Sequence, residues 1–415
     1  MLHAGQIPDP YVGARAVPIY QTTSYVFEST DEAAHLFELK QYGNIYSRIS
    51  NPTTAVLEER MASLENGTGS LAVASGMAAQ FGTFMTLCSP GDHLVASSQL
   101  YGGSMTQLTH TLKKLSISVS FVDPAETSAW EAAITPKTRA LFVEVIGNPV
   151  GSIADLEALA GLAKAHEIPL IVDSTFATPY LCRPIDWGAT IVIHSATKFI
   201  GGHGTSIGGV VVDSGDFDFG TNANIAEASP SYHGLKFYDT FGHYGFLMKL
   251  RTETVRDTGA CISPMNSFLL LQGLETLSLR MDRHVSNALA VAKFLDGHPA
   301  VGRVFYAGLP GHPHFERAKK YLPKGPGAVM SFELKQGTRE AGKRFIESLQ
   351  LFSHLANVGD AKSLVIHPGS TTHQQLSDEE LAAGGISAST IRLSVGLETI
   401  DDLLWDLDQA LCVPV

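Results

Sequence analysis

Short apolar segments alternate with helical patterns through the first half of the chain. Apolar residues recur at helical spacing in three places, which predicts helices over 52–67, 76–87 and about 103–114. Seven short apolar runs between them predict strands at 70–74, 93–96, 118–122, 140–145, 170–172, 191–193 and 209–212. Strands and helices that alternate in this way predict a mostly parallel sheet with helices on both faces.

The pattern changes beyond about residue 250. A leucine-rich segment over 267–298 predicts one long helix, and 339–349 predicts another. Strands are expected at 328–334, 365–366 and 391–395. With 415 residues, the chain is too long for a single small core. We therefore expect an α/β domain over 51–250 and a smaller C-terminal α+β domain over 251–415.

Two segments show no core pattern. Residues 1–50 contain several prolines and many polar residues, so an extended, irregular arm is expected there. Such an arm either packs on a neighbouring subunit or frays as a free terminus. Residues 217–244 are rich in Gly, Asn, Tyr and His, and they suit a subunit contact or a lid.

Composition narrows the classes of partner. The net charge of -12 disfavours nucleic acid and anionic membranes as partners. No apolar run has the length of a membrane span, and the N-terminal residues lack the pattern of a signal peptide. The four cysteines form no CxxC pair, so neither a disulfide framework nor a metal site is expected. A reducing cytoplasm fits this usage.

Lys198 is the strongest candidate for chemistry. It lies in Ser195-Ala196-Thr197-Lys198, directly after the apolar run 191–193, and glycines follow at 201, 202 and 204. A lysine in such uncharged surroundings is expected to have a lowered pKa and to be nucleophilic, whereas most lysines are solvated surface residues. Its amine could bind the aldehyde of pyridoxal phosphate as a Schiff base, and the nearby hydroxyls could hold the phosphate.

Asp173 is the second candidate, because it directly follows the apolar run 170–172. It is therefore expected at the carboxyl end of a strand, where α/β sheets bind their ligands. A buried carboxylate needs a cation, and a protonated pyridine nitrogen supplies one. The alternative is a loop aspartate that caps a helix. Gly76 and Met77 open a helix after a strand and offer an anion seat.

Four further side chains suit the same ligand. Tyr101 could stack on a planar ring and act as an acid or base. Tyr46 and Arg48 could bind a phosphate, and Arg392 lies in an apolar strand pattern where it needs an anion such as a substrate carboxylate.

Together these segments resemble the Cys/Met-metabolism family of pyridoxal-phosphate enzymes. The resemblance runs from Leu2-His3-Ala4-Gly5 to Leu411, and the block Ile193-His194-Ser195-Ala196-Thr197-Lys198-Phe199-Ile200-Gly201-Gly202-His203 is close to the family signature. It implies an α/β fold of the aspartate-aminotransferase-like type (fold type I of the PLP-dependent transferases), with pyridoxal 5′-phosphate as the cofactor.

The resemblance also implies roles for the matching residues. Lys198 would bind the cofactor aldehyde and move protons, Asp173 would hold the pyridine nitrogen, and Tyr101 would stack on the ring and assist proton transfer. The phosphate would be held by Gly76, Met77, Ser195 and Thr197. Asn148 would contact the ring hydroxyl, and Arg392 would bind the substrate carboxylate.

Tyr46 and Arg48 would reach the phosphate from the neighbouring subunit. A dimer is then the smallest active unit, and members of the family usually form homotetramers built from such dimers.

Within the family, the stretches 230–235, 259–264 and 357–364 resemble the sulfhydrylase branch. Methionine γ-lyases usually carry a cysteine two residues after the stacking tyrosine, and Gly103 stands there instead. The resemblance therefore implies a γ-replacement in methionine biosynthesis, in which O-acetyl-L-homoserine and sulfide give L-homocysteine and acetate.

Three alternatives stay open. Cystathionine γ-synthase and methionine γ-lyase activities would use the same machinery with cysteine or water. A dinucleotide-binding oxidoreductase would share the alternation, but 75–80 lacks a GxGxxG turn. A non-catalytic binding role is disfavoured by the complete set of Lys198, Asp173, Tyr101 and Arg392. The sequence leaves open the leaving group (acetyl, succinyl or phosphoryl), the use of O-acetylserine and the sulfur donor.

Overall fold

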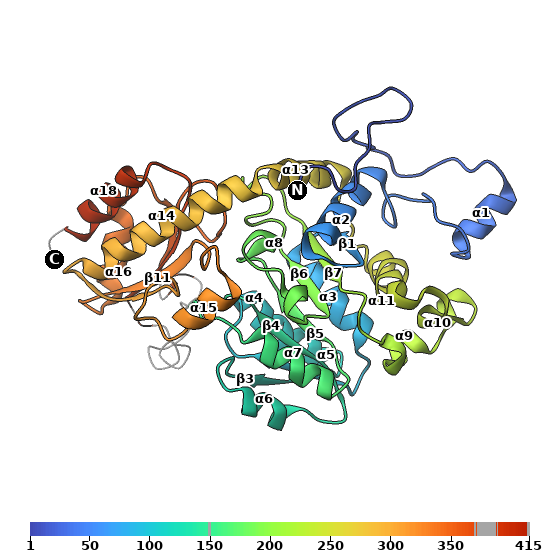
Figure 1. Ribbon diagram of the computed structural model, residues 1–415, viewed down its shortest axis with the longest axis horizontal. Coiled ribbons are helices and arrows are strands. Elements are labelled where there is room, and N and C mark those ends of the chain that lie inside the picture. The colour runs from blue at the N-terminus through green and yellow to red at the C-terminus, as the bar shows by residue number, and fades with distance from the viewer. Residues whose placement is uncertain (148–150, 369–370, 372–386, 388, 413–415) are drawn as a thin grey trace.

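The expected mostly parallel sheet forms the centre of the large domain. A computed structural model of the chain describes residues 1–147, 151–368, 371, 387 and 389–412. Seven strands pair in the order β1-β7-β6-β5-β4-β2-β3 (Figure 1). Their bounds are β1 Gly69–Val73, β2 His93–Ser97, β3 Ser118–Val122, β4 Thr138–Glu144, β5 Leu170–Asp173, β6 Ile191–His194 and β7 Gly209–Asp213. Only β7 runs antiparallel to its neighbours, so the carboxyl ends of β4, β5 and β6 meet at one edge.

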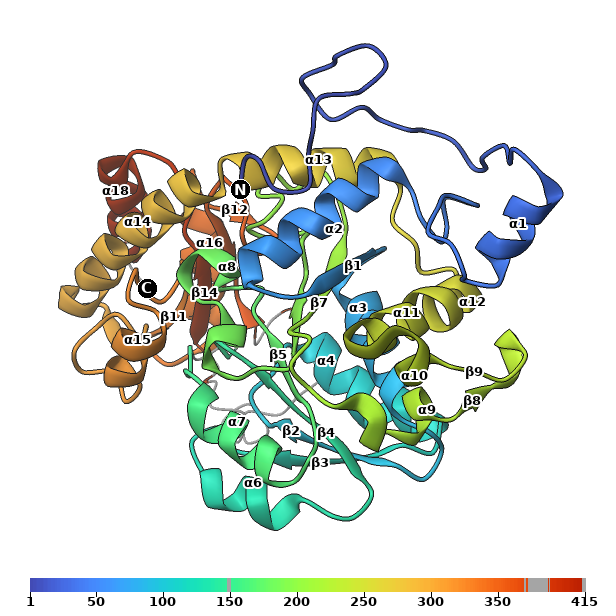
Figure 2. The ribbon, with the colours of Figure 1, turned by 45° about the vertical axis from the view of Figure 1, so that its right-hand side comes forward.

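Side chains along each strand alternate between two buried faces, as a sheet covered on both sides requires. In β4, Leu141 and Val143 pack into one core, and Ala140 and Phe142 pack into the other. Helix α2 (Pro52–Glu65) packs into the first core and α3 (Gly76–Leu87) into the second (Figure 2).

The remaining elements of this domain cover the sheet or connect its strands. The helices are α4 Gly102–Thr106, α5 Leu112–Lys114, α6 Thr127–Ala133, α7 Leu156–Ala165, α8 Thr178–Leu181, α9 Ala223–Ala226, α10 Phe237–Phe241, α11 Gly245–Lys249 and α12 Arg256–Thr258. The π-helical turns are η1 Gln107–Thr111 and η6 Leu250–Val255, and the 3₁₀ turns are η2 Pro184–Trp187, η3 Phe219–Thr221, η4 Pro230–Tyr232 and η5 Gly242–Tyr244. A two-stranded sheet joins β8 Ala228–Ser229 and β9 Leu235–Lys236.

The C-terminal part has its own sheet, in the order β10-β11-β14-β13-β12. Its strands are β10 Val301–Phe305, β11 Val329–Leu334, β12 Ser353–His354, β13 Leu364–Ile366 and β14 Thr390–Ser394. Its helices are α13 Pro264–Glu275, α14 Leu277–Gly297, α15 Phe315–Tyr321, α16 Arg339–Ser348 and α18 Ile400–Leu411. Helix α14 runs from the large domain across this smaller sheet (Figure 1). The expected α+β fold of the C-terminal part is confirmed, whereas the domain boundaries at residues 50 and 250 stay predictions.

Two predictions of secondary structure are wrong. The segment 267–298 is two helices, α13 and α14, which meet at Thr276, where the Arg280 side chain of α14 donates to the Gly273 carbonyl near the end of α13. The arm 1–50 is not wholly irregular, since it contains α1 (Thr30–Phe37), capped by the Ser29 side chain. Most of the arm extends away from the rest of the molecule (Figure 1). Among the described residues, no helix has the length and apolar character needed to cross a membrane.

Candidate active site

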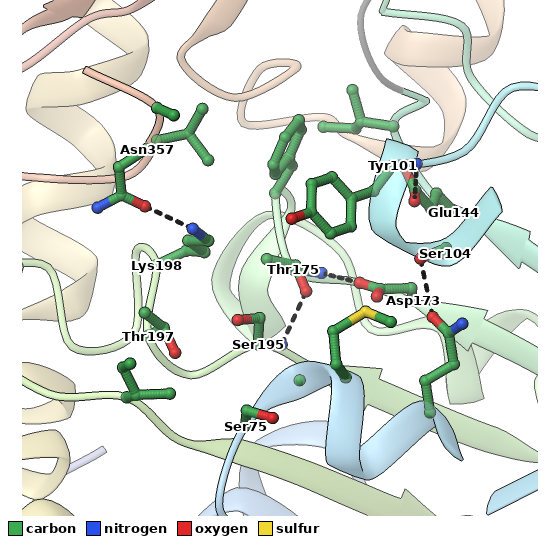
Figure 3. A pocket seen from close by; sticks show the side chains of 18 of the residues that line it. Ser75, Tyr101, Ser104, Glu144, Asp173, Thr175, Ser195, Thr197, Lys198 and Asn357 are labelled. Atoms are coloured by element: carbon green, nitrogen blue, oxygen red, sulfur yellow. Dashed lines mark hydrogen bonds between the residues drawn. The ribbon is translucent and has the colours of Figure 1, made fainter. Parts of the chain in front are cut away.

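A cavity of about 250 Å³ opens at the carboxyl ends of β4, β5 and β6, where it also meets the C-terminal domain (Figure 3). Its walls include Ser75, Gly76, Met77, Gln80, Tyr101, Ser104, Glu144, Ile146, Asp173, Thr175, Phe176, Ser195, Thr197, Lys198, Ile207, Ala356, Asn357, Val358 and Arg392. Most of the residues selected from the sequence therefore lie in one cavity, at the edge where parallel sheets bind ligands.

Lys198 projects into the cavity from the turn that follows β6. Its Nζ atom donates a hydrogen bond to Oδ1 of Asn357, at 2.5 Å, from a loop of the C-terminal domain (Figure 3). Burial lowers the pKa of the Lys198 amine, and the nearby Arg392 guanidinium lowers it further. A lowered pKa leaves more of the amine neutral and able to attack a carbonyl.

Asp173 and Glu144 form a pair of buried carboxyl groups. They are register partners at the ends of β5 and β4. Burial raises the pKa of Asp173, although hydrogen bonds from Thr175 oppose the rise; the Thr175 N–H donates to Oδ1 at 2.9 Å. Burial and repulsion from Asp173 hold the pKa of Glu144 well above its usual range. Two carboxyl groups this close cannot both ionise cheaply, and burial and repulsion from Asp173 both favour the protonated form of Glu144.

The N-terminus of α3 lies against Ser195. A Cβ atom on Gly76 would lie only 2.6 Å from the Ser195 Cβ, so glycine permits this approach. The Ser75 hydroxyl caps the helix by accepting from the Ala78 N–H at 3.0 Å. Thr197 is fixed nearby, because its hydroxyl donates to the Gly208 carbonyl and accepts from the Gly208 N–H. A helix N-terminus and two hydroxyls in this arrangement form a seat for a phosphate.

Tyr101 and Arg392 enter the cavity from opposite domains. The Tyr101 N–H donates to Oε1 of Glu144 at 2.7 Å, and its side chain is half-exposed. Arg392 lies in β14, and burial lowers its pKa to about 10. A buried guanidinium beside an open cavity suits a carboxylate ligand.

Two residues selected from the sequence do not line this cavity, and a third cannot be placed relative to it. Tyr46 and Arg48 are not among its lining residues; Arg48 instead donates to the Arg256 carbonyl at 2.5 Å. Asn148 lies outside the described residues.

Several lining residues were missed by sequence reasoning, and three of them form hydrogen bonds to selected residues. Glu144 closes β4 as Asp173 closes β5, and that position could have drawn attention to it. Thr175 accepts a hydrogen bond from the Ser195 N–H at 2.8 Å and so links two site residues. Asn357 comes from a distant loop, and no local pattern marks it as a partner of Lys198.

The donor set fits pyridoxal 5′-phosphate. It provides an amine of lowered pKa for the aldehyde, an acidic side chain for the pyridine nitrogen, and the N-terminus of α3 with the Ser195 and Thr197 hydroxyls for the phosphate. A crystal structure of a Campylobacter jejuni protein, described as a candidate O-acetylhomoserine (thiol)-lyase, contains N′-pyridoxyl-lysine-5′-monophosphate. It matches with a TM-score of 0.95 and 42% identity over 99% of this chain and 98% of that one. The fold is therefore that of the PLP-dependent fold-type-I enzymes.

The sequence comparisons are more specific. Residues 1–412 match the family described as "Cys/Met metabolism PLP-dependent enzyme", and the chain belongs to that family. O-acetyl-L-homoserine sulfhydrylase of Leptospira meyeri is 50% identical over 99% of this chain and 95% of its own length. O-acetyl-L-homoserine sulfhydrylase 1 of Thermus thermophilus is 52% identical over 99% and 98%. Homocysteine synthase of Schizosaccharomyces pombe is 50% identical over 99% and 96%.

Proposed function

We propose that the protein is an O-acetylhomoserine sulfhydrylase, which converts O-acetyl-L-homoserine and sulfide into L-homocysteine and acetate in methionine biosynthesis. The observation that carries this proposal is the Lys198–Asp173 cavity in a chain that is 50% and 52% identical, over nearly its full length, to proteins of that name.

Pyridoxal phosphate, when bound, withdraws electrons from the substrate carbon next to the amino group and so makes proton loss and departure of acetate possible. Asp173 keeps the pyridine nitrogen positively charged, which sustains that withdrawal. The Thr175 hydrogen bond holds the Asp173 carboxylate in place for this role.

Lys198 would hold the cofactor covalently through its amine and would also serve as the base that moves protons at the substrate carbons. Its lowered pKa suits this work because a larger fraction of the amine is neutral and able to accept a proton. Asn357 receives the freed amine through its Oδ1 atom and keeps it within the cavity.

The remaining residues bind and orient. The N-terminus of α3 at Gly76 and Met77 holds the phosphate together with Ser195 and Thr197. Arg392 would bind the substrate carboxylate, and Tyr101 would cover the ring and assist proton transfer.

The active unit is a homodimer that shares its sites, and two dimers form a tetramer. Tyr46 and Arg48 reach the phosphate of the neighbouring subunit. The absence of both from the lining of their own cavity supports this, as do the large exposed side chains of the arm, of which Val26 is 98% and Tyr11 91% exposed. We place the enzyme in the cytoplasm, which suits four free cysteines.

Homocysteine formation from O-acetyl-L-homoserine tests the proposal, with sulfide and then cysteine as the second substrate. Homocysteine with sulfide, from protein whose visible absorption reports bound cofactor, is the expected result. Cystathionine from cysteine would move the assignment to cystathionine γ-synthase, and ketobutyrate from methionine would move it to methionine γ-lyase. Light scattering of the purified protein separates tetramer from dimer.

A further inference from the structure

A buried arginine outside the cavity is hydrogen-bonded to the turn that carries Lys198. Arg280 lies near the start of α14 and is only 6% exposed. Its Nη1 donates to the Phe199 carbonyl at 2.7 Å, and its Nη2 donates to the Ile200 carbonyl at 3.1 Å. The guanidinium is therefore bound to the two residues that directly follow Lys198.

The same side chain also holds the break between α13 and α14. Nη2 donates to the Gly273 carbonyl at 2.7 Å, and Nε donates to the Thr276 hydroxyl at 3.2 Å. Within the described part of the chain, no ion pair involves Arg280. Carbonyl dipoles at the end of α13 thus stabilise the charge in place of a carboxylate, and burial lowers the pKa of Arg280 to about 10.

Glycines make room for this contact. A Cβ on Gly202 would lie 2.1 Å from Nη1 of Arg280, and Gly202 has a φ of +71° that favours glycine. A Cβ on Gly273 would lie 2.4 Å from the carbonyl oxygens of Ile200 and Gly201. The glycines that follow Lys198 thus let the backbone pack against Arg280 and α13.

The turn is also held from the other side. The Gly202 N–H donates to the Lys198 carbonyl at 2.7 Å, and the Gly202 carbonyl accepts from the Ala361 N–H at 2.9 Å. Asn357, four residues before Ala361, holds the Lys198 amine itself. Residues 198–202 are therefore clamped between α14 and the 357–361 loop.

We propose that Arg280 is a positioning residue that fixes the turn after Lys198, so that the amine points into the cavity whenever it is not bound to the cofactor. This inference rests on the proposed function, in which Lys198 alternates between holding the cofactor and moving protons. A shift of about 1 Å in a catalytic group is enough to slow a reaction about 100-fold.

Arg280→Lys tests the inference, because lysine keeps the charge but donates from a single nitrogen, so it cannot reproduce the four bonds that Arg280 donates from three nitrogens. The matched control is Arg60→Lys. Arg60 is also buried and donates to the backbone carbonyls of Ala4 and Leu2 at the start of the chain. It pairs with Glu275 at the end of α13, at 3.6 Å, but within the described part of the chain it donates to no carbonyl of residues 198–202.

Two readouts are needed, one of which uses no substrate. Cofactor-free Arg280→Lys protein is expected to take up pyridoxal phosphate about 10-fold more slowly than the wild type, measured by the rise of visible absorption, because the amine is misdirected. The loaded variant is expected to show a fall in kcat of about 100-fold with little change in KM. Arg60→Lys is expected to lower Tm but to leave both the uptake rate and kcat unchanged.

If both variants lower Tm alike while uptake and kcat stay normal in Arg280→Lys, Arg280 only stabilises the fold and the inference is overturned. Should Arg280→Lys fail to fold, Thr276→Val removes a single bond to Nε, and a smaller slowing of uptake is expected; normal uptake in folded Thr276→Val would then count against the inference. If the wild type made no homocysteine, the proposed function would fail, yet the uptake rates would still test Arg280.

Discussion

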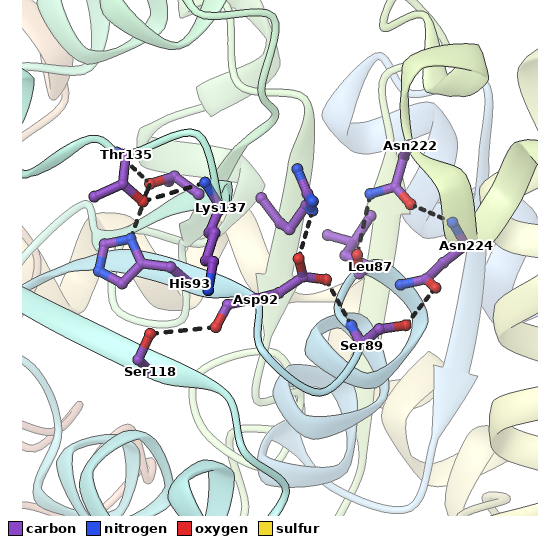
Figure 4. A network of polar contacts seen from close by, with 11 residues as sticks. Leu87, Ser89, Asp92, His93, Ser118, Thr135, Lys137, Asn222 and Asn224 are labelled. Atoms are coloured by element: carbon purple, nitrogen blue, oxygen red, sulfur yellow. Dashed lines mark hydrogen bonds and ion pairs between the residues drawn. The ribbon is translucent and has the colours of Figure 1, made fainter.

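Similar polar residues lie at the amino ends and at the carboxyl ends of the strands in the seven-stranded sheet, but their roles differ. These two ends of the strands are called the amino edge and the carboxyl edge of the sheet below. At the amino ends of β2, β3 and β4 the polar groups satisfy one another (Figure 4). Asp92 accepts from the Ser89 N–H at 2.7 Å and from Nε of Arg139 at 2.8 Å. The two ring nitrogens of His93 contact the hydroxyls of Thr138 and Ser120, at 2.8 and 2.9 Å.

At the carboxyl edge the polar groups line a cavity in which a ligand can bind to them. Asp173 and Glu144 lie side by side there, and their mutual repulsion is relieved only if one stays protonated or a cation binds. The Lys198 amine is hydrogen-bonded to the Asn357 amide and not to a carboxylate, so this bond does not require the amine to be protonated. The comparison separates polar residues that stabilise the fold from polar residues that are kept ready for chemistry.

Replacement of Lys198 by alanine gives the largest expected effect. Lys198→Ala removes both the covalent holder of the cofactor and the base, so kcat is expected to fall by at least about 10⁴-fold while Tm changes little. The control is Lys137→Ala, an exposed lysine at the opposite edge, which is expected to keep wild-type kcat. Near-normal turnover in Lys198→Ala would refute the assignment of the site.

The aspartates of the two edges provide the second test. Asp173→Asn is expected to lower kcat by about 10²–10³-fold, because the amide cannot stabilise a positive pyridine nitrogen. Asp92→Asn is expected to leave kcat unchanged and to cost about 1.5–3 kcal/mol of unfolding free energy through its charged hydrogen bonds. Steady-state kinetics and urea unfolding of both variants separate the two outcomes, and a fall of kcat in Asp92→Asn would break the comparison.

Much of the catalytic edge could be predicted from the sequence because local patterns mark it. Helix α3 starts and ends where its glycine and apolar pattern place it, at Gly76 and Leu87. Asp173 ends one buried strand and Lys198 follows another, and these two strands are neighbours. Each of these features depends on residues that are close together in the chain.

What could not be predicted depends on residues that are far apart in the chain. The expected single helix over 267–298 breaks at Thr276, and Arg280 donates to both Gly273 and Thr276 there while it grips the Lys198 turn. Asn357 meets Lys198 from the other domain. Helix propensity and periodicity do not register such tertiary contacts.

The third test concerns pH and Glu144. Its pKa is raised from 4.5 in the folded protein, so the protonated form contributes stability that is complete below pH 4.5 and is lost as pH rises through the folded value. Glu144→Gln keeps the acceptor for the Tyr101 N–H but cannot ionise. The cofactor-free variant is therefore expected to match the wild-type Tm at pH 4.5 and to exceed it at pH 8. Equal Tm values at pH 8 would mean that the carboxyl ionises without cost.

The smallest effect is expected at His93, with the opposite sign. Burial lowers its pKa from 6.5, so the neutral ring contributes stability that is present above pH 6.5 and is lost as pH falls through the folded value. His93→Gln removes this titration, so its Tm relative to the wild type is expected to rise as pH is lowered from 8 to 5, with kcat unaffected. A difference in Tm that is independent of pH would show that His93 does not titrate in this range. In that case the contributions of Glu144 and His93 to stability would not change with pH in opposite directions, which is what the burial of an acid at one edge and of a base at the other requires.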